Sequence, residues 1–450
     1  MAALRELLGD RLSTNEGIRR QHGASETHFG GHLPDLVAFA ESSEEVATVV
    51  ALCAAARLPV IAYGAGTCIE GNTSPIHGGL TLDLSRMDRI VAVNVADFDC
   101  TVQAGVRREE LNRQLRDTGL FFPIDPGANA TIGGMASTRA SGTNAVRYGT
   151  MREAVLGLTV VTADGRILRT SRRARKSSAG YDLTRLYVGS EGTLGIITEV
   201  TLRLHPLPAA LLSAVCSFAA LAGAVDTVVD AIHAGVPLAR VELLDATQMR
   251  AVNQWSKLDH PELSTLFFEF HGTEIQVAEQ VATVSEIARA HGGGDFRWSN
   301  LPEERSRLWK ARHEAYYAAL ALRPGSVGWP TDVCVPISRL AECIAETRAD
   351  LDTASMPTPI VGHVGDGNFH VIFVLDPNNP AEFAEAERLN DRLIERALGM
   401  DGTCTGEHGI GLGKQHWLVE ELGESVEEMR KLKRALDPLN ILNPGKVFQL

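Results

Sequence analysis

The chain has 450 residues, 44% of them hydrophobic and 22% charged, which is the usual balance of a soluble globular protein. At roughly 100–200 residues per domain, this length predicts two or three domains. The net charge of −13 argues against nucleic-acid binding, because phosphate recognition needs a positive surface. The basic run at residues 171–176 has no aromatic residues among its charges, and we interpret it as a solvated loop.

Cysteine usage and hydropathy indicate the compartment. The seven cysteines are odd in number and include no Cys-x-x-Cys pair, which argues against a disulfide framework, a zinc ribbon and a built-in iron–sulfur cluster. No apolar run reaches the ~18–20 residues of a membrane span, and the N-terminal region lacks the apolar stretch of a signal peptide. We therefore expect a cytoplasmic protein without a transmembrane segment, and peripheral association with the inner membrane stays open.

The first part of the chain mixes short strands and helices with many glycines. A Ser cap followed by two glutamates predicts the start of one helix, and Asp164-Gly165 predicts a hairpin turn. The predicted helices span residues 2–9, 42–57 and 107–119, and the predicted strands span 58–63, 80–84, 90–95, 100–104, 155–162, 166–170 and 196–204.

Prolines at positions 206 and 208 mark a boundary, after which strands alternate with longer helices. The predicted helices of this second part span residues 218–234, 273–291, 302–322, 342–351 and 381–398, and the predicted strands span 266–271, 360–361 and 369–375.

Histidines near the end of the chain carry the strongest chemical signal. His363 and His370 flank a Gly-Asp-Gly turn between two apolar runs. On one straight strand they would lie on opposite faces, so we expect the glycines to fold the chain back and bring both imidazoles together. Glu407 and His408 follow in another glycine-rich loop. Two imidazoles and a carboxylate suit Zn²⁺, Mn²⁺ or Fe²⁺. Hydrogen-bonded turn residues are the alternative, and the clustering favours a metal or catalytic site.

Glycine-rich loops form a second signal. The loop 64–71 follows a predicted strand, so its backbone N–H groups could cradle phosphates. Its glycine spacing differs from the dinucleotide fingerprint of nicotinamide enzymes, and residues 409–415 do not form a P-loop. Further clusters at 125–134, 141–144 and 189–195 lie in the same predicted domain. Together they favour a long phosphate-bearing ligand.

A third signal lies on the predicted helix 302–322. Arg312 and Tyr316 are four residues apart, which would place them on one helix face. An arginine facing a pocket can hold a substrate carboxylate through two parallel hydrogen bonds. A surface salt bridge with Glu304 or Glu314 is an equally good interpretation at this point.

Taken together, these motifs resemble the FAD-dependent 2-hydroxy-acid dehydrogenases of the vanillyl-alcohol-oxidase superfamily, and among them the D-lactate dehydrogenases that reduce a cytochrome or another carrier. The segments that carry the resemblance are 64–72, 125–134, 141–149, 179–185, 189–198, 331–336, 363–370, 402–413 and 442–446.

The resemblance implies an α+β fold. It places a lead-in at residues 1–30, a two-part FAD-binding domain of the p-cresol-methylhydroxylase type (PCMH-type) at 31–209, and a substrate-binding cap at 210–450. The cap has an antiparallel sheet, and its C-terminal segment returns to the flavin. In some relatives a histidine of the first glycine loop bonds covalently to FAD. The loop has no histidine here, which implies non-covalent FAD.

The resemblance also assigns individual residues. His363, His370 and Glu407 match divalent-metal ligands (Zn²⁺ or Mn²⁺), His408 matches the catalytic base, and Arg312 matches the carboxylate-binding arginine. The residues that match FAD contacts are Tyr63, Gly64, Ala65, Gly66, Thr67, Gly71, Asn72, Pro126, Gly127, Thr131, Gly134, Ser137, Gly142, Asn144, Gly149, Glu191, Gly192, Ile196 and Asn443.

The implied reaction is oxidation of D-lactate, or a similar small D-2-hydroxy acid, to the 2-oxo acid. Ile372 and Pro330 stand where 2-hydroxyglutarate enzymes carry polar residues, so a monocarboxylate is favoured. Electrons would pass to an external cytochrome, quinone, electron-transfer flavoprotein or oxygen. Whether the protein forms a homodimer is left open. Glycolate or 2-hydroxyglutarate oxidation, a metal hydrolase and a flavin carrier without turnover are the alternatives.

Overall fold

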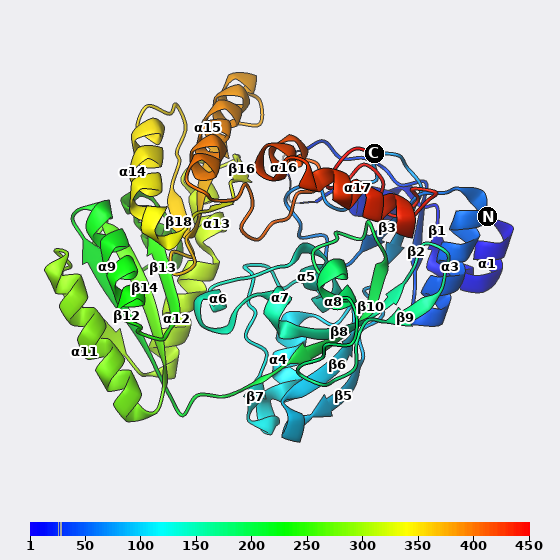
Figure 1. The fold of residues 1–450 in the computed structure, drawn as a ribbon. Coiled ribbons are helices and arrows are strands. Elements are labelled where there is room, and N and C mark those ends of the chain that lie inside the picture. The colour runs from blue at the N-terminus through cyan, green and yellow to red at the C-terminus, as the bar shows by residue number, and fades with distance from the viewer. Residues whose placement is uncertain (26, 28) are drawn as a thin grey trace. The chain divides into compact units, whose positions relative to one another are not determined.

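The computed structural model describes residues 1–25, 27 and 29–450, which form two compact units (Figure 1). The first unit contains Met1–Ser141, Gly149–Leu207 and Glu407–Leu450. The second contains Gly142–Tyr148 and Pro208–Gly406. Both units mix helices with sheets, and the predicted α+β class is confirmed.

The first unit contains two main sheets and several short helices. Its strands are β1 (Leu12–Ser13), β2 (Leu36–Phe39), β3 (Val60–Tyr63), β4 (Leu80–Asp83), β5 (Ile90–Asn94), β6 (Asp99–Gln103), β7 (Leu120–Phe121), β8 (Val155–Val161), β9 (Ile167–Arg169), β10 (Ile196–Arg203) and β11 (His205–Pro206). Its helices are α1 (Ala2–Leu8), η1 (Gly9–Arg11), α2 (Glu16–Gly23), α3 (Ser43–Ala56), η2 (Val95–Asp97), α4 (Arg108–Leu115), η3 (Arg116–Thr118), α5 (Ile132–Thr138), α7 (Met151–Ala154), α8 (Leu183–Tyr187), α16 (Gln415–Leu422) and α17 (Ser425–Leu436).

A four-stranded sheet in the order β1-β2-β4-β3 carries the first glycine loop. Its strands β2, β4 and β3 run parallel, and a helical crossover joins β2 to β3, which lie on either side of β4. The crossover helix α3 begins where predicted, because the Ser42 side chain accepts a hydrogen bond from the Glu45 N–H. Its apolar face, which includes Val46 and Val50, packs into the core of this sheet. The buried core of this sheet therefore supports the end of β3 and the loop after it.

The second sheet of this unit is antiparallel, in the order β5-β6-β10-β8-β9. Strands β8 and β9 form the predicted hairpin, with Gly165 at φ +80° in the turn. Helix α5 packs on β10, and a continuous cluster of buried side chains fills the space beneath them.

The second unit is built on one antiparallel sheet in the order β15-β12-β14-β13-β18-β19-β16, with β17 also paired to β19. The strands are β12 (Ala210–Phe218), β13 (Leu238–Leu244), β14 (Ser264–Gly272), β15 (Arg297–Ser299), β16 (Val327–Pro330), β17 (Val333–Cys334), β18 (Ile360–Gly362) and β19 (Asn368–Leu375). The helices are α6 (Ala145–Tyr148), α9 (Leu221–His233), α10 (Ala246–Ser256), α11 (Glu274–Ala290), α12 (Pro302–His313), α13 (Ala315–Ala321), η4 (Ile337–Arg339), α14 (Leu340–Leu351) and α15 (Pro380–Gly399).

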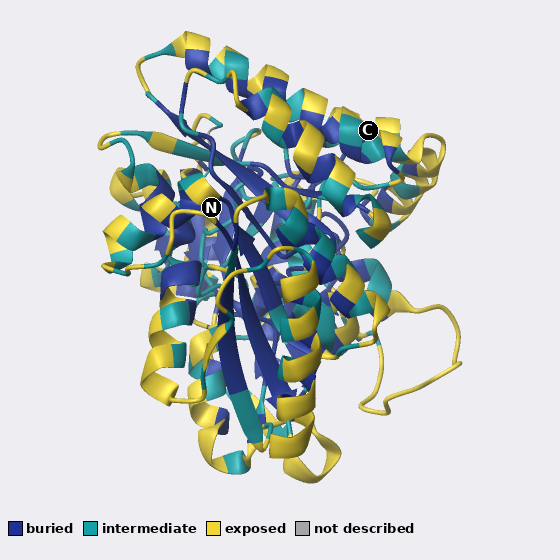
Figure 2. Cartoon of the chain, turned by 90° about the vertical axis from the view of Figure 1, so that its left-hand side faces the viewer, coloured by how far each residue is buried: buried dark blue, intermediate teal, exposed yellow. Residues whose placement is uncertain are grey.

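Helices cover both faces of this sheet. Helices α9 and α11 pack together on one face (Figure 1), and α10, α12 and α13 pack against the other. The central strands are buried between them, and the outer sides of the helices are exposed (Figure 2). Successive side chains of a strand point to opposite faces. In β14, Phe268 and Phe270 stack on one side, and Phe267 joins the cluster beneath α10, α12 and α13.

The structure corrects three sequence-based expectations in this unit. Strands β12 and β13 were not predicted, because both are buried on two sides and lack the polar alternation of a half-exposed strand. Residue Phe218, expected to begin a helix, ends β12. The predicted helix 302–322 is interrupted at Glu314, where ψ is 6°.

Within the described residues, no helix has both the length and the apolar character of a bilayer-crossing segment.

Candidate functional site

The first glycine loop follows β3 in the first unit. Gly66 adopts φ +71°, and a Cβ built on it would lie 2.0 Å from the Tyr63 hydroxyl. A Cβ on Gly64 would lie 2.2 Å from Oγ1 of Thr131. The structure therefore brings the loop at 64–67 against the start of α5, as expected if both contact one ligand. Burial raises the pKa of Tyr63 to about 12, so its hydroxyl stays protonated.

Among the described residues of the first unit, several polar atoms have no hydrogen-bond partner within the protein, which fits a bound FAD. In the part of the chain that the structure describes, the N–H groups of Ala65, Gly66 and Thr67 donate no hydrogen bond within the protein. The Oδ1 atom of Asn443 is buried and likewise accepts none there. Exposed N–H groups suit phosphate oxygens, and a buried amide oxygen suits a ring N–H.

Three predicted cofactor residues of the first unit bind one another. The side-chain amide of Asn443 donates to the backbone oxygens of Asn72 and Glu191, at 2.9 and 2.7 Å. Asn72 in turn donates to the Glu191 carboxylate at 2.6 Å. Glu191 also accepts the N–H groups of Ile410 and Gly411, at 2.7 and 2.9 Å. Its carboxylate therefore holds the loop after His408.

The other predicted FAD residues are divided between the units. The first unit holds Pro126, Gly127, Gly134, Ser137, Gly149, Gly192 and Ile196 with those above, and the second unit holds Gly142 and Asn144. The Ser137 backbone oxygen accepts the Glu191 N–H at 2.9 Å, which joins α5 to the same network. Ile196 points into the hydrophobic core at the start of β10. The Asn144 side chain accepts a hydrogen bond from Arg240 of β13 at 3.0 Å.

In the second unit, the chain folds back between His363 and His370 as predicted. Strands β18 and β19 pair antiparallel on either side of the turn, and the two imidazole centroids lie 5.6 Å apart. His370 lies on the sheet face that Ile372 and Val374 share beneath α13. Both histidines are buried.

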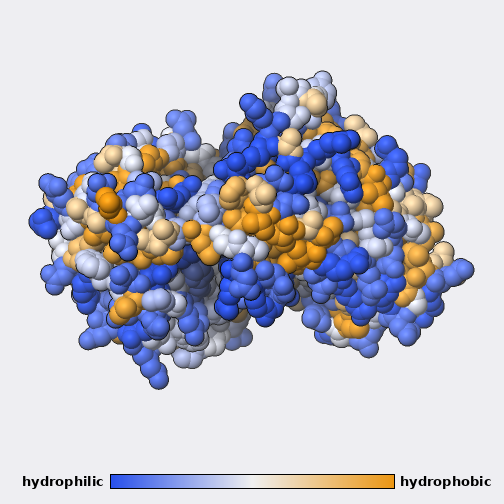
Figure 3. All heavy atoms as spheres, turned by 90° about the horizontal axis from the view of Figure 1, so that it is seen from below, coloured by the Kyte–Doolittle hydropathy of each residue, from blue (hydrophilic) through white to orange (hydrophobic). Residues whose placement is uncertain are grey.

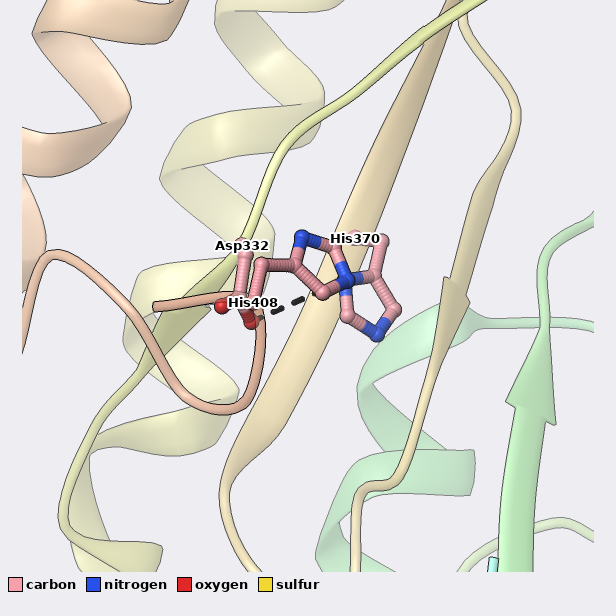
Figure 4. A group of neighbouring side chains, drawn as sticks. All are labelled: Asp332, His370 and His408. Atoms are coloured by element: carbon pink, nitrogen blue, oxygen red, sulfur yellow. Dashed lines mark ion pairs between the residues drawn. The ribbon is translucent and has the colours of Figure 1, made fainter. Parts of the chain in front are cut away.

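Hydrogen bonds define the tautomer of each histidine. The Nδ1 atom of His363 lies 2.7 Å from a carboxylate oxygen of Glu242, and Nδ1 of His370 lies 2.8 Å from the backbone oxygen of Thr331. A carbonyl and an ionised carboxylate can only accept, so each Nδ1 carries the hydrogen. The lone pair of each ring is then on Nε2, as in metal-binding histidines that are oriented by an acceptor behind them. Asp332 forms a second, longer pair with His370 Nδ1 at 3.8 Å (Figure 4).

Arg312 is buried and pairs with Glu242. Its Nε and Nη2 atoms lie 2.8 and 2.5 Å from Oε2 of Glu242. Of the two interpretations of Arg312, a surface salt bridge with Glu304 or Glu314 is wrong, because α12 turns Arg312 toward Glu242 in the sheet. Helix α12 ends at His313 and α13 begins at Ala315, so Arg312 and Tyr316 lie on successive helices.

Glu407 and His408 belong to the first unit. One Glu407 oxygen accepts the Ser141 hydroxyl at 2.6 Å. The His408 ring lies between two carboxylates, with Nδ1 4.0 Å from Glu70 and Nε2 3.9 Å from Glu407. Gly406, the last residue of the second unit, packs closely on Asn368 of the same unit, where a Cβ would lie 2.2 Å from Nδ2.

Glu242 and Glu70 were missed by reasoning from the sequence. The signal for Glu242 is a single carboxylate in the apolar run of β13, since a buried charge needs a partner. Burial would raise its pKa, but the charge of Arg312 and the hydrogen bonds from His363 and Arg312 outweigh this and hold the pKa below its usual value. Glu70 has no comparable signal in its loop.

Comparison with known proteins agrees with this geometry. The family model described as FAD linked oxidases, C-terminal domain, matches residues 207–447, and the FAD binding domain model matches 34–171. The chain is 53% identical over 455 residues to "Probable D-lactate dehydrogenase, mitochondrial" of Danio rerio, covering 100% of this chain and 92% of that protein. It is 46% identical over 451 residues to "D-lactate dehydrogenase [cytochrome], mitochondrial" of Arabidopsis thaliana, covering 100% and 80%.

A more distant relative, "Glycolate oxidase subunit GlcD" of Bacillus subtilis, is 34% identical over 421 residues and covers 92% of this chain and 89% of that protein. Among solved structures, p-cresol methylhydroxylase with substrate bound superposes with a TM-score of 0.83 at 18% identity, covering 99% and 96%. This last likeness shows the fold alone.

The fold and the glycine-lined loops thus define an FAD-dependent oxidoreductase. More closely, the chain belongs to the FAD-linked oxidases. The resemblance seen in its motifs, and with it the FAD cofactor, is confirmed.

Proposed function

We propose that this enzyme oxidises D-lactate to pyruvate, with two electrons passing to non-covalent FAD and then to an external cytochrome. The proposal is supported by relatives at 39–53% identity named D-lactate dehydrogenase, three of which carry the word cytochrome. Bound FAD would supply the electron acceptor that no protein side chain provides. The proposed division into an FAD-binding domain at 31–209 and a cap at 210–450 is supported by the two family-model matches, at 34–171 and 207–447.

One observation in the second unit supports a 2-hydroxy acid as the substrate. In the second unit, Glu242 holds His363 and Arg312 on its two carboxylate oxygens. A 2-hydroxy acid has its hydroxyl and carboxylate on adjacent carbons. Its binding site therefore needs a group that binds a metal or a proton at the hydroxyl, next to a cation that binds the carboxylate. The pairing leaves three N–H groups of Arg312 that are not bound to Glu242, enough to hold a substrate carboxylate with two of them.

We propose that His408 accepts the hydroxyl proton. Imidazole suits a base near neutral pH. The carboxylates of Glu70 and Glu407 near its ring would stabilise the positive charge that the ring gains. The hydrogen bonds from Ile410 and Gly411 to Glu191 hold the following loop, which restricts how far His408 can move.

The donor set fits a divalent cation. His363, His370 and Glu407 each offer one ligand atom, and both imidazoles have Nε2 as the basic nitrogen. We propose that these three residues hold Zn²⁺ or Mn²⁺, which would favour loss of the substrate hydroxyl proton when bound. Glu407 directly follows Gly406, which packs beside Asn368 on β19, two residues before His370.

The surroundings of His370 favour a small monocarboxylate. Ile372 is buried among apolar side chains two residues beyond His370, and its partner across the strands is Pro330. Neither side chain can bind a second carboxylate. Tyr316 packs on Gly328 in the same strand pair as Trp329, which adds further apolar surface. Glycolate would also fit this description, and it is the second candidate because GlcD is a relative.

Location and assembly remain predictions. The named relatives of Danio rerio and Arabidopsis thaliana are mitochondrial, whereas the sequence predicted a cytoplasmic protein. A homodimer is likewise a prediction. The metal hydrolase alternative is not supported, because it leaves the FAD-binding domain without a role.

The decisive experiment follows the flavin absorbance of the purified protein without oxygen. D-lactate is expected to bleach the flavin completely, and L-lactate is expected to leave it oxidised. Glycolate and D-2-hydroxyglutarate serve as competing substrates at equal concentration. Faster bleaching by glycolate would replace D-lactate as the substrate, and a flavin that none of these acids bleaches would indicate a carrier without this activity.

A further inference from the structure

Glu242 lies near the middle of β13 and is completely buried. Strand neighbours β14 and β18 flank it, and α12 covers it. Arg240, Glu242 and Leu244 lie on the same face of the strand, and Leu244 belongs to the cluster beneath α10, α12 and α13. A carboxylate in such surroundings is retained only when each of its oxygens is bound.

Each oxygen of Glu242 binds a different partner. Oε1 accepts from Nδ1 of His363 at 2.7 Å, whereas Oε2 accepts from Nε and Nη2 of Arg312 at 2.8 and 2.5 Å. The partners come from different parts of the chain, since His363 follows β18 and Arg312 lies on α12. One rigid carboxylate therefore sets the distance between an imidazole and a guanidinium.

We propose that Glu242 is a positioning residue that prepares His363 for a metal and Arg312 for the substrate carboxylate at the same time. The inference rests on the proposed function, because it gives those two residues their roles. By accepting the Nδ1 hydrogen, Glu242 keeps the lone pair of His363 on Nε2. By binding the Nε side of Arg312, it directs the opposite N–H groups of the guanidinium away from the strand.

The substitution Glu242→Gln tests this arrangement because it keeps the shape of the side chain. A glutamine has one acceptor and one donor group in place of two acceptors. If its oxygen stays with Arg312, its NH₂ faces Nδ1 of His363 and favours the tautomer with hydrogen on Nε2. If the amide is reversed, the NH₂ faces the N–H groups of Arg312. In both orientations one partner loses its acceptor, and the charge is lost for both.

Glu269 offers a matched control on the adjacent strand β14. It is also a buried glutamate beside an arginine and a histidine, with His271 Nε2 at 2.8 Å and Arg240 Nε at 3.6 Å. It contacts neither His363 nor Arg312. Glu269→Gln therefore removes an equivalent buried charge from the same sheet without touching the proposed positions.

Two dissociation constants are to be measured on FAD-loaded protein. The first is for Zn²⁺ alone, by competition with a chelator after metal removal. The second is for pyruvate on metal-free protein, from the change in flavin absorbance. Loss of an acceptor behind a metal-binding histidine weakens metal binding about 10–100-fold. We expect Glu242→Gln to raise both constants at least about tenfold, and Glu269→Gln to leave both within about twofold.

Glu242→Asp is a second variant that keeps the charge but is too short to reach both partners, and it is expected to move both constants in the same direction. An unchanged constant for either ligand in Glu242→Gln overturns the shared role, as does an equal loss in Glu269→Gln. If the wild-type protein binds both ligands and Glu242→Gln binds them equally well, the inference alone fails. If the wild-type protein binds neither, the proposed function fails with it.

Discussion

The environment of His408 favours uptake of a proton by its ring and restricts the position of the residue. Its ring has a carboxylate near each nitrogen, and its backbone oxygen accepts a hydrogen bond from Asn72 at 3.3 Å. The carboxylates favour the protonated ring, and the backbone contact limits movement of the loop. These are the properties expected of a general base that must take up a proton without leaving its place.

We predict that His408→Ala slows flavin reduction by D-lactate at least ~100-fold, the usual scale for loss of a general base. The FAD content should be unchanged, because the hydrogen bonds from Asn72, Ile410 and Gly411 to Glu191 are kept. The rate is measured by stopped-flow absorbance without oxygen. His416→Ala is the control, since His416 is exposed on the next helix. A rate for His408→Ala within a fewfold of the control would remove His408 from this role.

At the scale of elements, strand β14 and its neighbours form a second buried polar network. Glu269 lies among Arg240 of β13, Arg305 of α12 and His271, whose Nδ1 lies 2.8 Å from the Tyr148 hydroxyl. Burial alone would raise the pKa of Glu269, but the charge of Arg240, the hydrogen bond from His271 and the charge of Arg305 lower it to about 2. The network joins a sheet strand to α6 and α12.

This pKa predicts a pH dependence of stability. Because the folded pKa of about 2 lies below the ordinary 4.5, the unfolded chain binds more protons between these values. The stabilisation by Glu269 is therefore complete above pH 4.5 and is lost as the pH falls toward 2, by at most about 1.4 kcal/mol per pH unit. Urea unfolding of wild type and Glu269→Gln should give midpoints that converge as the pH falls below 4.5. A constant difference between the two midpoints down to pH 3 would contradict this.

The elements of the site differ in how far the sequence predicts them. The turn between β18 and β19 was predicted, because apolar runs and glycines are local signals that indicate a hairpin. The partner of Arg312 was not, since Glu242 lies 70 positions earlier and only the packing of α12 on β13 brings them together. The interruption of the helix at Glu314 also has no local signal, because the residues around it favour a helix. Contacts between distant segments therefore account for most of what the sequence could not show.

At the scale of the whole molecule, charge and cysteine chemistry bear on the proposed transfer of electrons to an external acceptor. All seven cysteines are free, and Cys53, Cys100, Cys216, Cys343 and Cys404 are buried. Burial raises the pKa of Cys53 and Cys100 to about 12, so these thiols are unreactive. Under the proposed function, electrons from FAD would pass to an acceptor outside the chain. Hydrophilic side chains occupy much of the face drawn in Figure 3, in keeping with a chain of net charge −13.

This charge predicts how the rate of electron transfer depends on salt. An acidic protein attracts a basic cytochrome, and this attraction raises the association rate at low ionic strength. The Debye length falls from about 30 Å at 0.01 M to about 10 Å at 0.1 M salt, so the attraction is screened over that range. We therefore expect D-lactate-dependent reduction of a basic cytochrome c to slow severalfold between these concentrations, when the cytochrome is limiting. Reduction of an uncharged quinone by the same preparation should change little, because no charge attracts it. Equal salt dependence with both acceptors would place the effect on the flavin step, and a rate with cytochrome that rises with salt would show that the contact surface is not acidic.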